Sequence, residues 1–133
     1  MVKVALIDII GLTYDGNTLS KRGLGGSESA VILMSKELAA LGFDVTVFNN
    51  CIDREAEEGV YDGVKYIDHS HIGQGPYDFD VVISSRTVFP FAQEKDYASL
   101  RYNSSAYKPI VANAKHKVVW LHDTFCQGDH LLE

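Results

Sequence analysis

The chain has 133 residues, and about 100–200 residues usually make one domain, so a single domain is expected. Apolar residues make up 46% and charged residues 23%, which is ordinary for a globular protein and too apolar for a disordered one. No apolar run approaches the roughly 18–20 residues that cross a bilayer, and no signal-peptide cleavage site follows the amino terminus. The sequence therefore predicts neither a membrane-spanning nor an exported protein.

The net charge of −6 comes from one part of the chain, because residues 51–80 hold eight acidic side chains against two basic ones. This charge excludes long-range attraction for nucleic acid, although it leaves the local capture of one phosphate open. Cys51 and Cys126 lie far apart and in no paired motif, which predicts two reduced thiols in a cytosolic protein.

The first third of the chain predicts a strand, a long loop, a helix and a second strand. An unbroken apolar run over residues 2–10 is typical of a strand buried on both faces, as in a parallel sheet. Residues 11–26 contain five glycines and no periodicity, and a loop of this length within a compact domain is commonly functional. Helical spacing of apolar residues predicts a helix over residues 27–41, with Ser27 as its N-cap.

The helix is expected to end at Gly42, with Phe43 closing that end, and residues 43–48 form the second strand of a right-handed βαβ unit. Residues 49–63 are predicted to be an acidic connection. Further strands are predicted at residues 64–67, 79–84 and 117–122, a helix at about 89–100, and no definite element at 102–108. The predicted fold is an open, doubly wound α/β domain with one parallel sheet in the order 3-2-1-4-5.

The segment Gly23-Leu-Gly-Gly-Ser-Glu28 joins the loop to the helix and predicts a phosphate site. Backbone N–H groups and the helix dipole favour an anion there, and glycine lets a phosphate approach the backbone. A dinucleotide-binding fingerprint is disfavoured, since a loop separates the glycines from the first strand, Glu28 replaces the third glycine, and Asn49 and Asn50 stand where an acidic residue would bind ribose. A Walker motif is also excluded, because no Lys-Ser/Thr follows the glycines. A flexible turn without a ligand is the alternative.

Three segments carry a resemblance to a known family. Gly-Gly-Ser-Glu at the helix start, followed by Ala-Leu-Gly-Phe-Asp-Val-Thr-Val-Phe, resembles the N-terminal domain of retaining family-four (group 1) glycosyltransferases with the GT-B fold. Tyr77-Asp-Phe-Asp-Val-Val-Ile-Ser-Ser-Arg86 resembles the fourth strand of that family. Val118-Val-Trp-Leu-His-Asp123 resembles the strand that ends in the family's histidine.

The resemblance implies that residues 1–131 are the Rossmann-like, acceptor-side half of a cytosolic glycosyltransferase. Such an enzyme moves a sugar from a nucleotide diphospho-sugar to an acceptor, with retention and without a cofactor or bound metal. The domain that binds the nucleotide would be missing, so the chain alone should be inactive. Residues 132–133 resemble the Leu-Glu that expression vectors place before a histidine tag.

By the same resemblance, Gly25 and Gly26 would contact the diphosphate through backbone N–H groups, and His122 would lie beside the transferred sugar. The position of His122 supports this independently, because open α/β sheets bind ligands at the carboxyl ends of their strands. A histidine satisfied by the backbone is the alternative. The further binding candidates are Ser85, Arg86 and Asp123.

Two other functions stay open. The first is a free-standing Rossmann-like module that binds a nucleotide or phosphate without catalysis, and the second is an NAD(P)-dependent enzyme, which Asn49 and Asn50 disfavour. Zinc binding by His122, Cys126 and His130 is disfavoured, since Gly128 weakens the helix that would align them. His69 and His71 are expected in an exposed loop, and Tyr97, Tyr102 and Tyr107 are expected to pack rather than line an acceptor groove.

Overall fold

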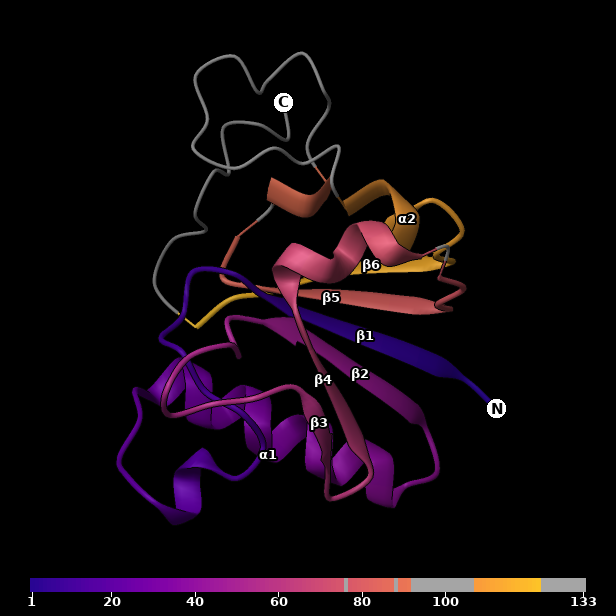
Figure 1. Ribbon diagram of the computed structural model, residues 1–133. Helices are drawn as coiled ribbons and strands as arrows, with labels where there is room; N and C mark the ends of the chain where they lie inside the picture. Colours follow the sequence, from indigo (N-terminus) through magenta and orange to yellow (C-terminus); the bar gives the residue numbers. More distant parts are fainter. Residues whose placement is uncertain (76, 88, 92–106, 123–133) are drawn as a thin grey trace.

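The computed structural model describes residues 1–75, 77–87, 89–91 and 107–122, which form an α/β domain around a six-stranded sheet (Figure 1). The sheet order is β3-β4-β2-β1-β5-β6. The strands are β1 (Lys3–Asp8), β2 (Asp44–Asn49), β3 (Gly59–Tyr61), β4 (Val64–Asp68), β5 (Val81–Ser85) and β6 (His116–Trp120). All neighbouring strands are parallel except β3 and β4, which are antiparallel.

The five predicted strands are present in the predicted order 3-2-1-4-5, but the sheet is mixed rather than wholly parallel. The additional strand β3 lies within residues 49–63, which the sequence analysis treated as connection only. Asp62 and Gly63 have φ angles of +51° and +80°, which identifies a tight hairpin turn between β3 and β4. An Asp-Gly pair between apolar residues is the sequence signal for such a hairpin, and three residues of strand were too short to show alternation.

Helix α1 (Gly26–Ala40) begins one residue earlier than predicted. Its N-cap is Gly25 in an extended conformation, not Ser27, and no side chain caps this end. The Gly25 carbonyl instead accepts hydrogen bonds from the backbone N–H and the hydroxyl of Ser29, at 3.0 and 2.9 Å. The helix therefore starts with exposed backbone.

The predicted end of α1 is confirmed. Gly42 has a φ of +98°, its N–H donates to the Ala39 carbonyl at 3.0 Å, and the Phe43 N–H donates to the Leu38 carbonyl at 3.2 Å. These two bonds define a Schellman motif, which requires the left-handed conformation that glycine adopts without strain.

Both faces of the sheet are covered (Figure 1). Helix α1 packs on one face, over β1, β2 and β4, where alternate strand residues such as Leu6 and Val47 are buried. The other face carries the short helices η2 (His69–Gln74), η3 (Phe89–Phe91) and α2 (Lys108–Val111) over residues such as Ile7 and Phe48. When helices cover both faces of a sheet, the ends of its strands remain accessible to a ligand.

Some predictions fall outside the described residues. The predicted helix at 89–100 is described only over Phe89–Phe91, which is a 3-10 turn, and α2 lies where no definite element was expected. Tyr107 is buried in the core, as expected for packing, whereas Tyr97 and Tyr102 lie outside the described residues. In the described ranges, no helix has the length and apolar character needed to cross a membrane.

Candidate functional site

The carboxyl ends of β2, β1, β5 and β6 form one edge of the sheet. Asp8 stands opposite Asn49, Ser85 stands opposite Trp120, and the pairing of Ile7 with Ser84 brings Asp8 beside Ser85. By strand alternation these four side chains lie on the face that α1 covers. From β1 the chain continues to β2 on one side and later to β5 on the other, so the strand order reverses at β1. The row of four side chains therefore crosses a topological switch point, which is the usual ligand crevice of open α/β sheets.

The row contains buried polar atoms that have no hydrogen-bond partner among the described residues: Asp8 Oδ1, Asn49 Oδ1 and Ser85 Oγ. His122 Nε2 has the same status, and the His122 ring lies 4.3 Å from the Trp120 ring between centroids. Buried polar atoms are normally hydrogen-bonded, so a group of unpartnered ones at a strand-end crevice indicates a place for a ligand or water. Ser85 and His122 were predicted from the sequence, and Asp8 and Asn49 were not.

Arg86 connects this edge to the start of α1. Its Nη1 donates to Ser27 Oγ at 3.4 Å, and its backbone N–H donates to the Trp120 carbonyl at 3.0 Å. Arg86 has a φ of +68°, an uncommon conformation for a residue with a side chain and one that is typical of functional sites. The structure thus brings Arg86 to the first turn of α1, beside Gly25 and Gly26.

Gly25 and Gly26 are both exposed, but they differ in their surroundings. A Cβ on Gly25 would stand 2.5 Å from Glu28 Oε2, whereas a Cβ on Gly26 would meet nothing within 4 Å in the described part of the chain. Space for a ligand therefore exists at Gly26, at the positive end of the helix dipole. His122 lies at the same edge, two residues after Trp120, and the predicted partner Asp123 lies outside the described residues, as do Cys126 and His130.

Asn49 and Asn50 hold the glycine loop (residues 11–25) against the sheet. Asn49 Nδ2 donates to the Tyr14 carbonyl at 2.8 Å, and the Tyr14 N–H donates to the Asn50 carbonyl at 3.0 Å. Asn50 Nδ2 donates to the Gly11 carbonyl at 3.3 Å. Residues that the sequence analysis used only to exclude NAD therefore fix the loop that carries the proposed phosphate site.

Asp8 is the charged residue at the centre of this edge, and it is 1% exposed. Its Oδ2 accepts the Tyr14 hydroxyl at 2.6 Å. Burial raises the pKa of Asp8; the Tyr14 hydrogen bond opposes that rise, the charge of Glu28 adds to it, and Arg86 opposes it. The sequence signal was a single acid at the end of a buried apolar strand, which is visible but not specific.

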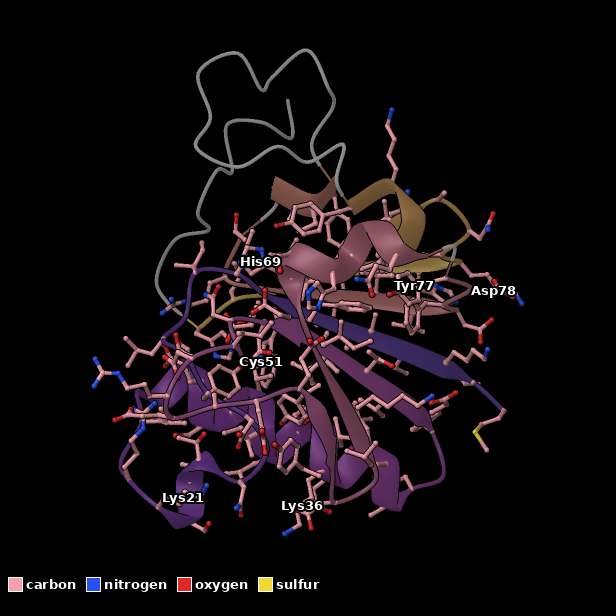
Figure 2. The ribbon with its side chains drawn as sticks, in the orientation of Figure 1. Lys21, Lys36, Cys51, His69, Tyr77 and Asp78 are labelled. Atoms are coloured by element: carbon pink, nitrogen blue, oxygen red, sulfur yellow. The ribbon has the colours of Figure 1, made fainter. Side chains whose placement is uncertain are left out.

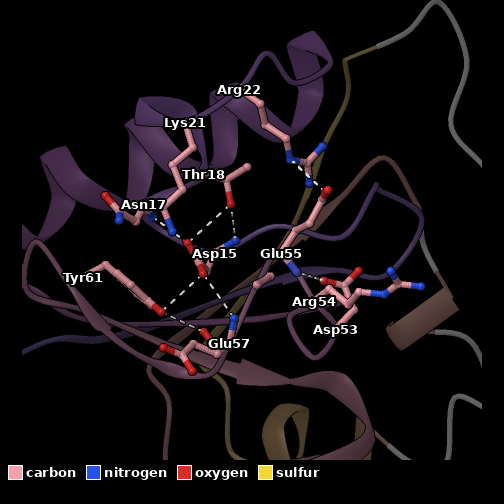
Figure 3. Close-up of a pocket in the computed structure, with 11 residues that line it drawn as sticks. Asp15, Asn17, Thr18, Lys21, Arg22, Asp53, Arg54, Glu55, Glu57 and Tyr61 are labelled. Carbon is pink, nitrogen blue, oxygen red and sulfur yellow. Dashed lines mark hydrogen bonds and ion pairs between the residues drawn. The ribbon is translucent and has the colours of Figure 1, made fainter.

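A separate polar cavity of about 660 Å³ lies between the glycine loop and residues 53–61 (Figure 3). Asp15 forms its floor, and Lys21, Arg22, Arg54 and Tyr61 are among the residues that line it. Arg22 Nη2 donates to the Thr13 carbonyl at 2.6 Å, and its Nε lies 3.3 Å from Glu55 Oε2. The cavity walls thus carry charges of both signs. The cavity was not predictable from the sequence, because its walls come from two loops that are distant in the chain.

The cysteine and histidine predictions have mixed outcomes. Cys51 is fully buried, and desolvation followed by the charge of Asp68 raises its pKa to about 12, which makes it an unreactive thiol (Figure 2). His69 and His71 are half-buried on η2 rather than exposed in a loop. His71 Nδ1 lies 2.8 Å from Glu58 Oε1, and that hydrogen bond raises the pKa of His71.

Within the residues the structure describes, no group of three or more His, Cys, Asp or Glu side chains could hold a metal ion. No protein-family model matches the chain, and neither a curated protein nor a solved structure is significantly similar to it. The chain is therefore established as an α/β domain with a mostly parallel, mixed six-stranded sheet, and no family is identified for it.

Proposed function

We propose that the first turn of α1 binds a phosphate group, and that the chain is the N-terminal half of a GT-B glycosyltransferase that uses a nucleotide diphospho-sugar. The observation that carries the proposal is the approach of Arg86 Nη1 to Ser27 Oγ, at 3.4 Å, beside the open position at Gly26. The Arg86 guanidinium, the backbone N–H groups of the first turn and the helix dipole then act on one anion.

In this function the site stabilises the leaving diphosphate. Charge develops on the departing phosphate as the sugar is transferred, and donors fixed before the reaction lower the barrier. The N–H group of Gly26 and the Arg86 guanidinium would face the phosphate, and Ser85 and His122 would face the sugar. A second domain would supply the remaining nucleotide contacts, because half a cleft cannot orient two substrates.

A free-standing phosphate- or nucleotide-binding module is the second candidate. It uses the same residues, so binding alone does not separate the two. Transfer of sugar by a longer chain that includes a second domain would support the enzyme, whereas ligand binding by that longer chain without any transfer would support the module. In the longer chain we expect His122→Ala to lower turnover at least about tenfold while leaving the melting temperature unchanged, since a strand-end side chain contributes little to the core.

Phosphate binding is tested by calorimetry with pyrophosphate and uridine diphosphate as probes. Gly26→Val should weaken binding by about tenfold or more, because a side chain would occupy the space left at the helix start. Gly23→Val is the matched control: Gly23 lies on the same loop, also has nothing within 4 Å of a Cβ among described residues, and is not at the helix N-terminus. Equal loss in both variants, or no binding by the unchanged chain, contradicts the proposal.

A further inference from the structure

Asp8 lies where the glycine loop meets the sheet, and its hydrogen bonding is incomplete. Its Oδ2 accepts the Tyr14 hydroxyl at 2.6 Å and the Gly11 backbone N–H also favours the carboxylate, but Oδ1 is buried without a hydrogen-bond partner in the described ranges. A charged carboxylate in such a place would ordinarily be hydrogen-bonded through both oxygens. The environment therefore favours the neutral acid more than an exposed site would.

A second acid, Glu28, lies near Asp8 and acts on its charge. Both side chains approach Gly11, since a Cβ on Gly11 would stand 2.8 Å from Asp8 Oδ2 and 3.1 Å from Glu28 Cγ. Glu28 is 5% exposed, and its Oε1 accepts the Leu12 N–H at 3.2 Å. The negative charge of Glu28 disfavours the ionisation of Asp8.

We propose that Asp8 is a positioning residue for the glycine loop, and that it attaches the loop more firmly when it carries a proton than when it is ionised. With Asp8 neutral, the pair with Glu28 holds at most one negative charge, which the nearby Arg86 balances. Ionisation adds a buried negative charge, which the Tyr14 hydroxyl, Arg86 and the Gly11 backbone N–H offset only in part, because burial and the charge of Glu28 outweigh them.

The effect reaches the loop through direct contacts. Tyr14 is bonded to Asp8 by its hydroxyl and to Asn49 and Asn50 by its backbone, and Leu12 is bonded to Glu28. A charge change at Asp8 thus acts on residues 11–14, which lead into the loop that ends at α1. The inference concerns the attachment of this loop and holds whatever ligand α1 takes.

The sign of the pH dependence follows from burial, which raises the pKa of Asp8 above its ordinary 3.8. The contribution of protonated Asp8 to stability is complete below pH 3.8 and is lost as the pH rises through the folded-state pKa. The folding constant falls by at most about tenfold for each pH unit. Asp8→Asn keeps the shape and an acceptor for Tyr14 without any charge. We expect Asp8→Asn to unfold at a higher urea concentration than the unchanged protein at pH 7.5, and at the same concentration at pH 3.5.

Hydrogen exchange gives a local measurement of the same effect. At pH 7.5 the Leu12 and Tyr14 amides should exchange more slowly in Asp8→Asn than in the unchanged protein. Asp15→Asn is the matched control, because Asp15 is a buried aspartate whose oxygens accept several donors, and it should unfold at lower urea at both pH values. A less stable or unfolded Asp8→Asn at pH 7.5, or a pH-independent difference, overturns the proposal.

Carbon-13 NMR of the Asp8 carboxyl tests the proposal without relying on that variant. The titration midpoint should lie above 3.8 in the unchanged protein, fall in Glu28→Gln, and rise in Tyr14→Phe, because these variants remove opposite influences on Asp8. A merely structural role would not move the midpoint in opposite directions. A midpoint at or below 3.8, or shifts of the same sign, overturns the proposal.

Discussion

Asp8 and Asp15 are both buried aspartates, 1% and 3% exposed, and they stand in opposite kinds of environment. Asp15 accepts hydrogen bonds from the backbone N–H groups of Asn17 and Glu57 and from the hydroxyls of Thr18 and Tyr61. Asp8 accepts one from Tyr14 and lies near a second acid. Asp15 therefore joins the loops that form the cavity in Figure 3. Asp8 has one carboxylate oxygen without a hydrogen-bond partner among the described residues, at the sheet edge where a ligand is expected.

The difference shows that hydrogen bonds to a buried carboxylate stabilise one region of the fold and are incomplete in the other. A carboxylate that satisfies donors from three segments stabilises the arrangement of those segments. Buried groups without partners cost stability, and such costs are concentrated at functional sites. The unpartnered atoms of Asp8, Asn49 and Ser85 all lie at the ends of parallel strands, whereas both carboxylate oxygens of Asp15 accept hydrogen bonds.

The largest expected effect is at the complete cluster. Asp15→Ala removes the acceptor of four donors, and the donor Thr18 is buried together with Asp15. We expect a loss of about 3 kcal/mol in the free energy of unfolding, measured by urea denaturation. Asp53→Ala is the control, because Asp53 is exposed and its carboxylate accepts the Glu55 N–H at 2.6 Å rather than four donors. Similar losses of stability in both variants would contradict the claim that the hydrogen bonds of Asp15 stabilise the fold.

The second prediction concerns strain at the ligand edge. Arg86→Gly and Arg86→Ala both remove the guanidinium, but only glycine adopts a φ of +68° without strain. Arg86→Gly should therefore be about 1 kcal/mol more stable than Arg86→Ala, by the same denaturation measurement. Both should lose pyrophosphate affinity to the same degree. If the two variants are equally stable, Arg86 stores no strain and its conformation is not a mark of function.

The order of the five main strands could be predicted because each is a short apolar run bounded by glycine or polar residues, and right-handed crossovers limit the topology. The Schellman end at Gly42 was predictable from one residue and its neighbour. The N-cap at Ser27 was wrong, since Gly25 caps the helix by backbone alone and no side chain competes for that role. Local sequence cannot rank two candidates that lie two residues apart when both are compatible with an extended backbone.

The site divides in the same way. Gly26 and Arg86 were found because strand ends and glycine-rich helix starts are local signals, and the fold brings strand ends to one edge. The contacts of Asp8 with Tyr14 and Glu28 could not be found, because they depend on the path of a loop that has no periodicity. The Asp15 cavity was missed for the same reason, as its walls lie about forty residues apart in the chain.

The smallest expected effect is the loss of stability when His71 loses its proton, and it occurs in a different pH range from that of Asp8. His71 and Glu58 join η2 to the acidic segment that borders the Asp15 cavity, at 2.8 Å, and Glu58 also accepts the Asp68 N–H at 3.1 Å. The hydrogen bond to Glu58 raises the pKa of His71, so the stabilisation is complete below pH 6.5 and is lost as the pH rises through the folded-state pKa.

The melting temperature of the unchanged protein should therefore exceed that of His71→Gln at pH 6 and approach it at pH 8.5. His69→Gln is the control for loss of an imidazole from the same helix, because the contact with Glu58 is made by His71. This window begins near pH 6.5, whereas the loss attributed to Asp8 begins near pH 3.8, so the two titrations can be measured in one protein. A single transition that Asp8→Asn and His71→Gln both abolish would mean that the two regions are coupled, and the comparison between them would fail.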